Sequence, residues 1–172
     1  MFIIYHRKVE IHSFVLKIVE NKKRLDWDEY FMKIAHPVRE RATCDRGMAG
    51  SVIVKDKRIL TTGYVGSPAG LPHCDEVGHI IKEITHEDGT KTKHCLRTTH
   101  SEINAIVQAA KFGISIDGGT IFTTMAPCPV CAKAIISSGI KRVVANKDYH
   151  QANESKKMFE DVGVKYDLLN SE

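Results

Sequence analysis

The chain has 172 residues, of which 42% are hydrophobic and 27% charged, and its formal net charge is +4. A chain of this length can form one domain with a full hydrophobic core but is too short for two such domains. The composition is that of an ordinary soluble globular protein. The mild basic excess suits phosphorylated ligands, but it does not separate a small ligand from a nucleic acid.

The N-terminus carries no pattern typical of a secretory signal. Residues 1–5 are apolar, but His6, Arg7 and Lys8 follow at once, so no hydrophobic region of signal-peptide length forms. No stretch is long and apolar enough to span a bilayer, so we expect no membrane partner and a cytoplasmic location. In that reducing compartment, five cysteines indicate metal binding or catalysis rather than disulfides.

Residues 1–25 read as an N-terminal extension, and residues 26–170 as the functional domain. Apolar residues at helical spacing within 11–19 favour an amphipathic helix in the extension. A second amphipathic pattern predicts a helix over 27–38, with Pro37 expected to kink or break it. Two short strands then follow, 51–55 and 58–62, joined by a charged turn.

Residues 64–98 form an irregular insertion that is rich in Gly, Pro, His and Cys, with a short helix expected at 79–84. Beyond the insertion the apolar pattern alternates between helical and strand periodicity. It predicts helices at 103–110, 128–138 and 154–161 and strands at 120–124, 142–145 and 164–168. A hairpin followed by this alternation predicts an α/β fold, a three-layer α/β/α domain around a mixed five-stranded sheet.

Two short motifs carry the chemistry, and each lies where a helix is expected to begin. The first is His100-Ser101-Glu102 and the second is Pro127-Cys128-Pro129-Val130-Cys131. Either motif alone is weak, because a lone CxxC could be a redox pair. In this order, H-x-E followed by P-C-x-x-C is the signature of zinc-dependent deaminases that act on nucleobases.

The residue types in these motifs suit a catalytic zinc ion. Cys128 and Cys131 lie three residues apart on one helix face, and the positive end of the helix dipole favours their thiolate forms. His100 supplies a third ligand, so the fourth tetrahedral position stays open for water. Glu102 is then placed to move protons between water, base and departing amine, the alternative being a carboxylate that merely stabilises the first helical turn.

Over residues 26–169 the sequence resembles the deoxycytidylate (dCMP) deaminase family, within the cytidine deaminase-like superfamily. The matching segments are 27–32, 41–44, 63–70, 73–78, 100–106 and 126–133. The resemblance implies hydrolysis of dCMP to dUMP and ammonia, which supplies the precursor of dTMP. It also implies a homo-oligomer, with dCTP and dTTP as regulators and Mg2+ accompanying these triphosphates. By the same analogy Tyr149, Asn104 and Tyr64 are candidates for contacts with the substrate.

Two positions depart from the family pattern. Ser101 stands where the family usually has alanine, a small change that we expect to be tolerated. Val65 stands where the family generally has an asparagine that is expected to hydrogen-bond the nucleotide, so either that contact comes from elsewhere or substrate affinity or effector control is altered. The sequence does not decide between a monophosphate and a triphosphate substrate.

A second, structural zinc is expected in the insertion, because some family members carry one there. Its ligands are expected to be four of Cys44, Cys74, Cys95, His73 and His94, with the fourth ligand left open between the two histidines. Three thiolates and one imidazole form a closed site that would hold together a segment with little apolar content.

Two other functions fit parts of the pattern. A tRNA adenosine deaminase uses the same zinc chemistry, but the modest net charge and the cysteine-bearing insertion favour a small substrate over a stable nucleic-acid partner. A zinc module that only binds nucleotide or protein would have no need of Glu102.

Overall fold

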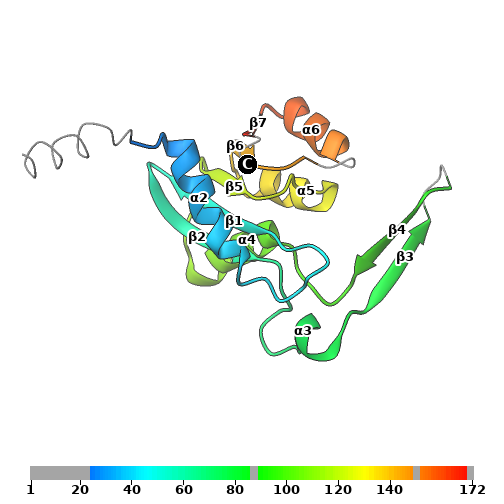
Figure 1. The fold of residues 1–172 in the computed structure, drawn as a ribbon. Coiled ribbons are helices and arrows are strands. Elements are labelled where there is room, and N and C mark those ends of the chain that lie inside the picture. Colours follow the sequence, from blue (N-terminus) through cyan, green and yellow to red (C-terminus); the bar gives the residue numbers. More distant parts are fainter. Residues whose placement is uncertain (1–23, 86–88, 149–151, 170–172) are drawn as a thin grey trace, which may run out of the picture.

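The computed structural model describes residues 24–85, 89–148 and 152–169. Five strands form one mixed sheet in the order β2-β1-β5-β6-β7 (Figure 1). The strands are β1 (Gly50–Lys55), β2 (Arg58–Tyr64), β5 (Thr120–Thr123), β6 (Arg142–Ala145) and β7 (Lys165–Leu168). Strand β1 runs antiparallel to β2 and β5, whereas β5, β6 and β7 are parallel. The mixed five-stranded sheet predicted from the sequence is confirmed.

Helix α2 (Trp27–Arg39) covers one face of this sheet. Its buried residues Phe31, Met32 and Ala35 form one hydrophobic cluster with Val52 of β1 and Phe122 of β5. Because successive strand residues point to opposite faces, the neighbouring strand positions belong to the other face.

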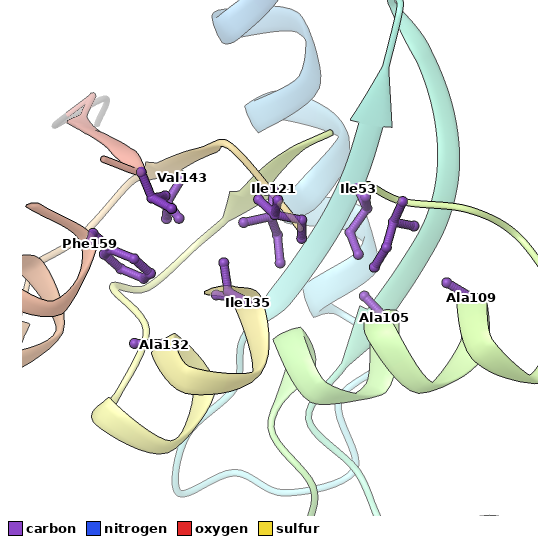
Figure 2. Packing of buried hydrophobic residues seen from close by; sticks show 11 residues of the cluster. Ile53, Ala105, Ala109, Ile121, Ala132, Ile135, Val143 and Phe159 are labelled. Carbon is purple, nitrogen blue, oxygen red and sulfur yellow. The ribbon is translucent and has the colours of Figure 1, made fainter. Parts of the chain in front are cut away.

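Three helices cover the other face: α4 (Ser101–Phe112), α5 (Pro129–Ser137) and α6 (Ala152–Asp161). Figure 2 shows how this layer packs, with strand side chains lying against side chains from the three helices. The labelled residues are Ile53, Ile121 and Val143 from the strands and Ala105, Ala109, Ala132, Ile135 and Phe159 from the helices. The three-layer α/β/α arrangement is therefore confirmed.

Of the kink or break predicted at Pro37, the break is wrong, because helix α2 runs on to Arg39. Proline removes one backbone hydrogen bond to the residue four positions earlier. Since the helix ends two residues after Pro37, little regular helix lies beyond the missing bond.

None of the described helices combines the length and apolarity needed to cross a bilayer.

The insertion forms a β-ribbon that projects from the body of the domain (Figure 1). Its strands β3 (Ile81–Thr85) and β4 (Lys91–Cys95) pair antiparallel, and the short helix α3 (Cys74–Val77) precedes them. The helix predicted at 79–84 is therefore wrong. Isoleucine and threonine favour extended backbone, and pairing with β4 satisfies the hydrogen bonds of this segment. The helix expected within 11–19 lies outside the described residues.

One arginine links three elements at the far edge of the sheet. Arg142 of β6 donates to both carboxylate oxygens of Asp28 in α2, at 2.8 and 2.6 Å, and to Asp167 of β7 at 2.7 Å. Burial opposes the charge of Asp167, but hydrogen bonds from Arg142 and Lys165 hold its pKa below its usual value. Bidentate pairs of this kind fix geometry as well as adding energy.

We expect Arg142→Met to lower the free energy of unfolding by about 1–2 kcal/mol at pH 7, because two carboxylates lose their shared cation. The pKa of Asp167 is lowered by folding, so its contribution is present above its unfolded pKa and is lost as pH falls through the folded value. Urea unfolding at pH 7 and pH 3 should therefore show a difference that shrinks in acid. Arg58→Met, at an exposed position, is the control; an equal loss there would refute this role for Arg142.

Candidate active site

The two sequence motifs meet where α4 and α5 begin. His100 is the residue that caps the N-terminus of α4, and Cys128 has the same place in α5, with Pro129 at the first helical position. Proline is well tolerated there because its missing N–H would have no partner within the helix. Gly63 of β2 lets α4 approach closely, since a Cβ at this position would collide with the carbonyl oxygen of Ser101.

The side chains of His100, Cys128 and Cys131 converge. Nδ1 of His100 lies 3.5 Å from Sγ of Cys128 and 3.4 Å from Sγ of Cys131, and all three atoms lie within 4.8 Å of one another. In a tetrahedral zinc site, neighbouring nitrogen and sulfur ligands lie about 3.6 Å apart, given Zn–S and Zn–N bonds of about 2.3 and 2.0–2.1 Å. The donor types and their spacing therefore fit a zinc ion.

The local electrostatics prepare this cluster for a cation. Hydrogen bonding from Cys131, helped by His100, lowers the pKa of the Cys128 thiol to about 3 despite partial burial. The hydrogen bond to Cys128 in turn raises the pKa of His100. The hydrogen bond to Cys128 also raises the pKa of Cys131. A thiolate is the form that ligates zinc, so Cys128 already has the form that binds the ion, while His100 and Cys131 would give up their protons to it.

Glu102 lies on the first turn of α4 and is only 5% exposed. Burial raises its pKa, while the positive charge of His100 and a hydrogen bond from Ser101 act in the opposite direction. A carboxylate that only stabilised the first turn of a helix would not need to be buried in this way. A buried carboxyl group next to a metal-ligand cluster is the arrangement expected of a general acid–base group.

A cavity of about 160 Å³ opens beside His100. Its lining brings the cationic side chains of Arg46 and Lys93 to the same space as the hydroxyl of Thr98 and the apolar side chain of Val65. Val65 is nearly fully buried. The lining of the cavity therefore includes both cationic side chains and an apolar one, next to the proposed metal ligands.

The three residues proposed to contact substrate lie in different surroundings. Asn104 donates from Nδ2 to the backbone oxygen of Tyr64 at 2.7 Å, so this amide group supports the end of β2 beside the cavity. Tyr64 is the last residue of β2 and is partly buried. Tyr149 lies outside the described residues.

A second cluster joins α3 and the ribbon to the body of the domain. Cys44, Cys74, His79 and Cys95 place their ligand atoms within 4.8 Å of one another. Nδ1 of His79 lies 3.7 Å from Sγ of Cys44, and the thiols of Cys74 and Cys95 are 3.6 Å apart. These separations match those between ligands of one tetrahedral zinc ion, about 3.6–3.8 Å, and four protein ligands close the site.

Neighbouring groups support this second donor set. Nε2 of His79 lies 3.0 Å from Oδ1 of Asp45, the kind of carboxylate contact that orients metal-ligating histidines. Burial opposes ionisation of Cys95, but hydrogen bonds from the backbone near Arg97 and Ile80 and from His79 lower its pKa to about 6.

The histidine that joins these thiols is His79, and neither of the two histidines expected from the sequence takes this place. Nδ1 of His73 lies 3.0 Å from Oγ1 of Thr43, and Nε2 of His94 lies 2.9 Å from Oγ1 of Thr92. His94 and Cys95 are neighbours in β4, where adjacent side chains point to opposite faces. His73 is the N-cap residue of α3, and Cys74 is the first residue of that helix. A histidine several residues away in the same loop was the better candidate.

Comparison with known proteins agrees with this geometry. The model of the cytidine and deoxycytidylate deaminase zinc-binding region matches residues 25–147. ComE operon protein 2 of Bacillus subtilis is 41% identical over 142 residues, covering 83% of this chain and 70% of that protein. The deoxycytidylate deaminase of Mycobacterium phage D29 is 36% identical over 129 residues, covering 73% and 98%.

A solved structure agrees as well. The dCMP deaminase of cyanophage S-TIM5 in complex with dCMP and dUMP superposes with a TM-score of 0.69 at 30% identity, covering 86% of this chain and 99% of that one. The family match spans both metal-ligand motifs and most of the domain. The chain therefore belongs to the cytidine and deoxycytidylate deaminase family.

Proposed function

We propose that this chain is a zinc-dependent hydrolase that converts dCMP and water to dUMP and ammonia. The observation that carries the proposal is the convergence of His100, Cys128 and Cys131 beside the buried carboxyl group of Glu102. The relatives named as deoxycytidylate deaminases, and the related structure with dCMP and dUMP, support a cytosine nucleotide as the substrate.

The three ligands would hold zinc at the N-termini of α4 and α5, and one coordination position would be left for water. Zinc bound to these ligands would lower the pKa of a water molecule to about 7 and so make hydroxide available at neutral pH. Glu102 would accept a proton from water and deliver it to the ring nitrogen next to the carbon that carries the amine, as the hydroxide adds to that carbon. Glu102 would then take the proton of the added hydroxyl group and pass it to the amine, which departs as ammonia while the C–N bond breaks and the carbonyl forms. A buried carboxyl group with a raised pKa is suited to hold a proton between these transfers.

The direct test is incubation of zinc-loaded protein with dCMP, following the loss of cytosine absorbance and the release of ammonia. Deoxycytidine, dCTP and tRNA serve as competing substrates in the same assay. Turnover of dCMP in preference to the others supports the proposal. Deamination of adenosine in tRNA alone, with salt-dependent tRNA binding, would instead favour a tRNA deaminase.

The cavity beside His100 supports a substrate that carries a phosphate. Arg46 and Lys93 line it, and Arg46 contacts the backbone oxygen of Lys93 at 3.5 Å. Guanidinium groups bind phosphate through charge-assisted hydrogen bonds. We propose that the base of dCMP lies at the metal site and that its 5′-phosphate lies near Arg46 and Lys93.

We expect Arg46→Ala to raise the KM for dCMP by at least about tenfold, because one charge-assisted hydrogen bond to the phosphate is lost. The KM for deoxycytidine, which has no phosphate, should hardly change. Steady-state kinetics with both substrates measure this, with the exposed Arg41→Ala as control. An equal rise in KM for both substrates would mean that Arg46 supports the fold and does not bind the phosphate.

We further propose that the second cluster holds a structural zinc, with Cys44, Cys74, His79 and Cys95 as its ligands. Such an ion would join the loop after α2, helix α3 and the ribbon. The cysteine ligands of both sites require reduced thiols, which supports a reducing compartment such as the cytoplasm.

Regulation by dCTP and dTTP with Mg2+, and assembly into a homo-oligomer, are proposed from the family resemblance. Large apolar side chains on the surface of the described residues, such as Phe112, Val130 and Leu96, support an assembly that would cover them. Light scattering measures the oligomer, and initial rates at low dCMP concentration with and without dCTP measure activation. Val65, with its apolar side chain at the cavity, is where we expect any change in this control to arise.

A further inference from the structure

A line of three buried hydroxyl groups lies behind Glu102. Oγ of Ser101 donates to Oε2 of Glu102 at 3.0 Å, and the hydroxyls of Ser101 and Ser51 are 2.8 Å apart. The Ser51 hydroxyl lies 3.2 Å from that of Thr123, which donates to the backbone oxygen of Met125 at 3.0 Å. Ser51, Ser101 and Thr123 are all fully buried.

The hydroxyl groups come from three separate elements, β1, α4 and β5. The line runs from the carboxyl group of Glu102 to a carbonyl oxygen of the loop that leads to Cys128 and Cys131. Buried polar groups that are fully hydrogen-bonded rigidify their surroundings. The line therefore connects the carboxyl group to the sheet and to the loop that carries two of the proposed metal ligands.

The number of protons fixes the direction of these bonds. A carboxylate can only accept, so Ser101 donates to Glu102 and must accept from Ser51, while Thr123 donates to Met125. If Glu102 carries a proton, the two bonds nearest to it can reverse, so that Glu102 donates to Ser101 and Ser101 donates to Ser51. Ser51 can then donate to Thr123, while Thr123 still donates to the backbone oxygen of Met125. The same hydroxyls can therefore serve Glu102 before and after it takes up a proton during turnover.

We propose that Ser101 is a positioning residue, and that Ser51 and Thr123 behind it complete a hydroxyl chain that orients the carboxyl group of Glu102. This inference rests on the proposed deaminase function. It also goes beyond the expectation that serine is tolerated in place of the family's usual alanine, since alanine has no group to bond either Glu102 or Ser51.

The test is the steady-state kinetics of Ser101→Ala with dCMP. We expect kcat to fall about tenfold, the rate equivalent of one hydrogen bond to a charged group, while KM and zinc content stay unchanged. Ser155→Ala is the matched control, because Ser155 is equally buried in α6 and its hydroxyl has no partner within the described residues. That variant should retain the full kcat.

A double-mutant cycle separates a connected chain from independent effects on folding. Ser51→Ala should lower kcat by a smaller factor, because Ser101 can still donate to Glu102, and should have no further effect once Ser101 is alanine. Infrared difference spectra against Glu102→Gln give a readout that needs no turnover: the carboxyl band should shift in Ser101→Ala and stay in place in Ser155→Ala.

Several results would overturn the inference. They are an unchanged kcat in Ser101→Ala, a rise in KM alone, and a Ser51→Ala effect that is equal in both backgrounds. Failure of the wild-type protein to turn over dCMP would overturn the proposed function instead. In that case the infrared band still tests whether Ser101 orients Glu102.

Discussion

Glu102→Gln should lower kcat for dCMP by about 10³-fold, the middle of the range for loss of a general acid–base group. The amide keeps the size of the side chain and can still accept a hydrogen bond from Ser101, but it cannot take up and release protons. Zinc content measured by elemental analysis should stay unchanged, because the proposed ligands are His100, Cys128 and Cys131. KM should change much less than kcat.

Glu154→Gln is the matched control for this prediction. Glu154 also lies in the first turn of a helix, α6, but it is exposed and outside the site. If Glu102 only stabilised its helix through the dipole, both variants would lose about 0.3–1 kcal/mol of stability and keep their activity. Retention of turnover by Glu102→Gln would remove the proton-transfer role assigned to this residue.

The core of the fold could be predicted because its helices bury one face each and its central strands are short apolar runs that are buried on both faces. The apolar spacing within 27–38 predicted helix α2, whose buried face is Phe31, Met32 and Ala35, whereas Trp27 and Tyr30 of the predicted face are exposed. The ribbon was missed for the opposite reason: every residue of β3 is exposed, so burial imposes no alternation on its sequence. Its strands are instead defined by backbone pairing between segments that the sequence pattern does not connect.

The predicted active-site residues form two pairs, and the spacing within each pair is local. Cys128 and Cys131 lie at the start of one helix, and His100 and Glu102 at the start of another, so each pair needs only the helix to place it. The sequence pattern could not predict which distant segments contact these residues. Ser51 and Thr123, on neighbouring strands, approach Ser101 only because β1 pairs with β5 beneath α4.

The second metal site should depend on His79 and on neither of the other two histidines of the insertion. We expect His79→Ala to reduce the zinc content from two ions per chain to one, since only three thiols remain, while His73→Ala and His94→Ala keep both ions. Asp45→Ala, which leaves the ligands intact but frees the His79 ring, should weaken binding of this ion by about 10–100-fold.

Loss of this ion should have a large effect on the insertion, because closed zinc sites contribute directly to folding. We expect proteolysis within residues 64–98 to become much faster in His79→Ala, while the catalytic site keeps its own zinc. Since Cys44 and Cys95 also line the cavity beside His100, KM for dCMP should rise more than kcat falls. Two zinc ions in His79→Ala, or the loss of one in His73→Ala, would contradict the assignment and return the fourth ligand to one of the neighbouring histidines.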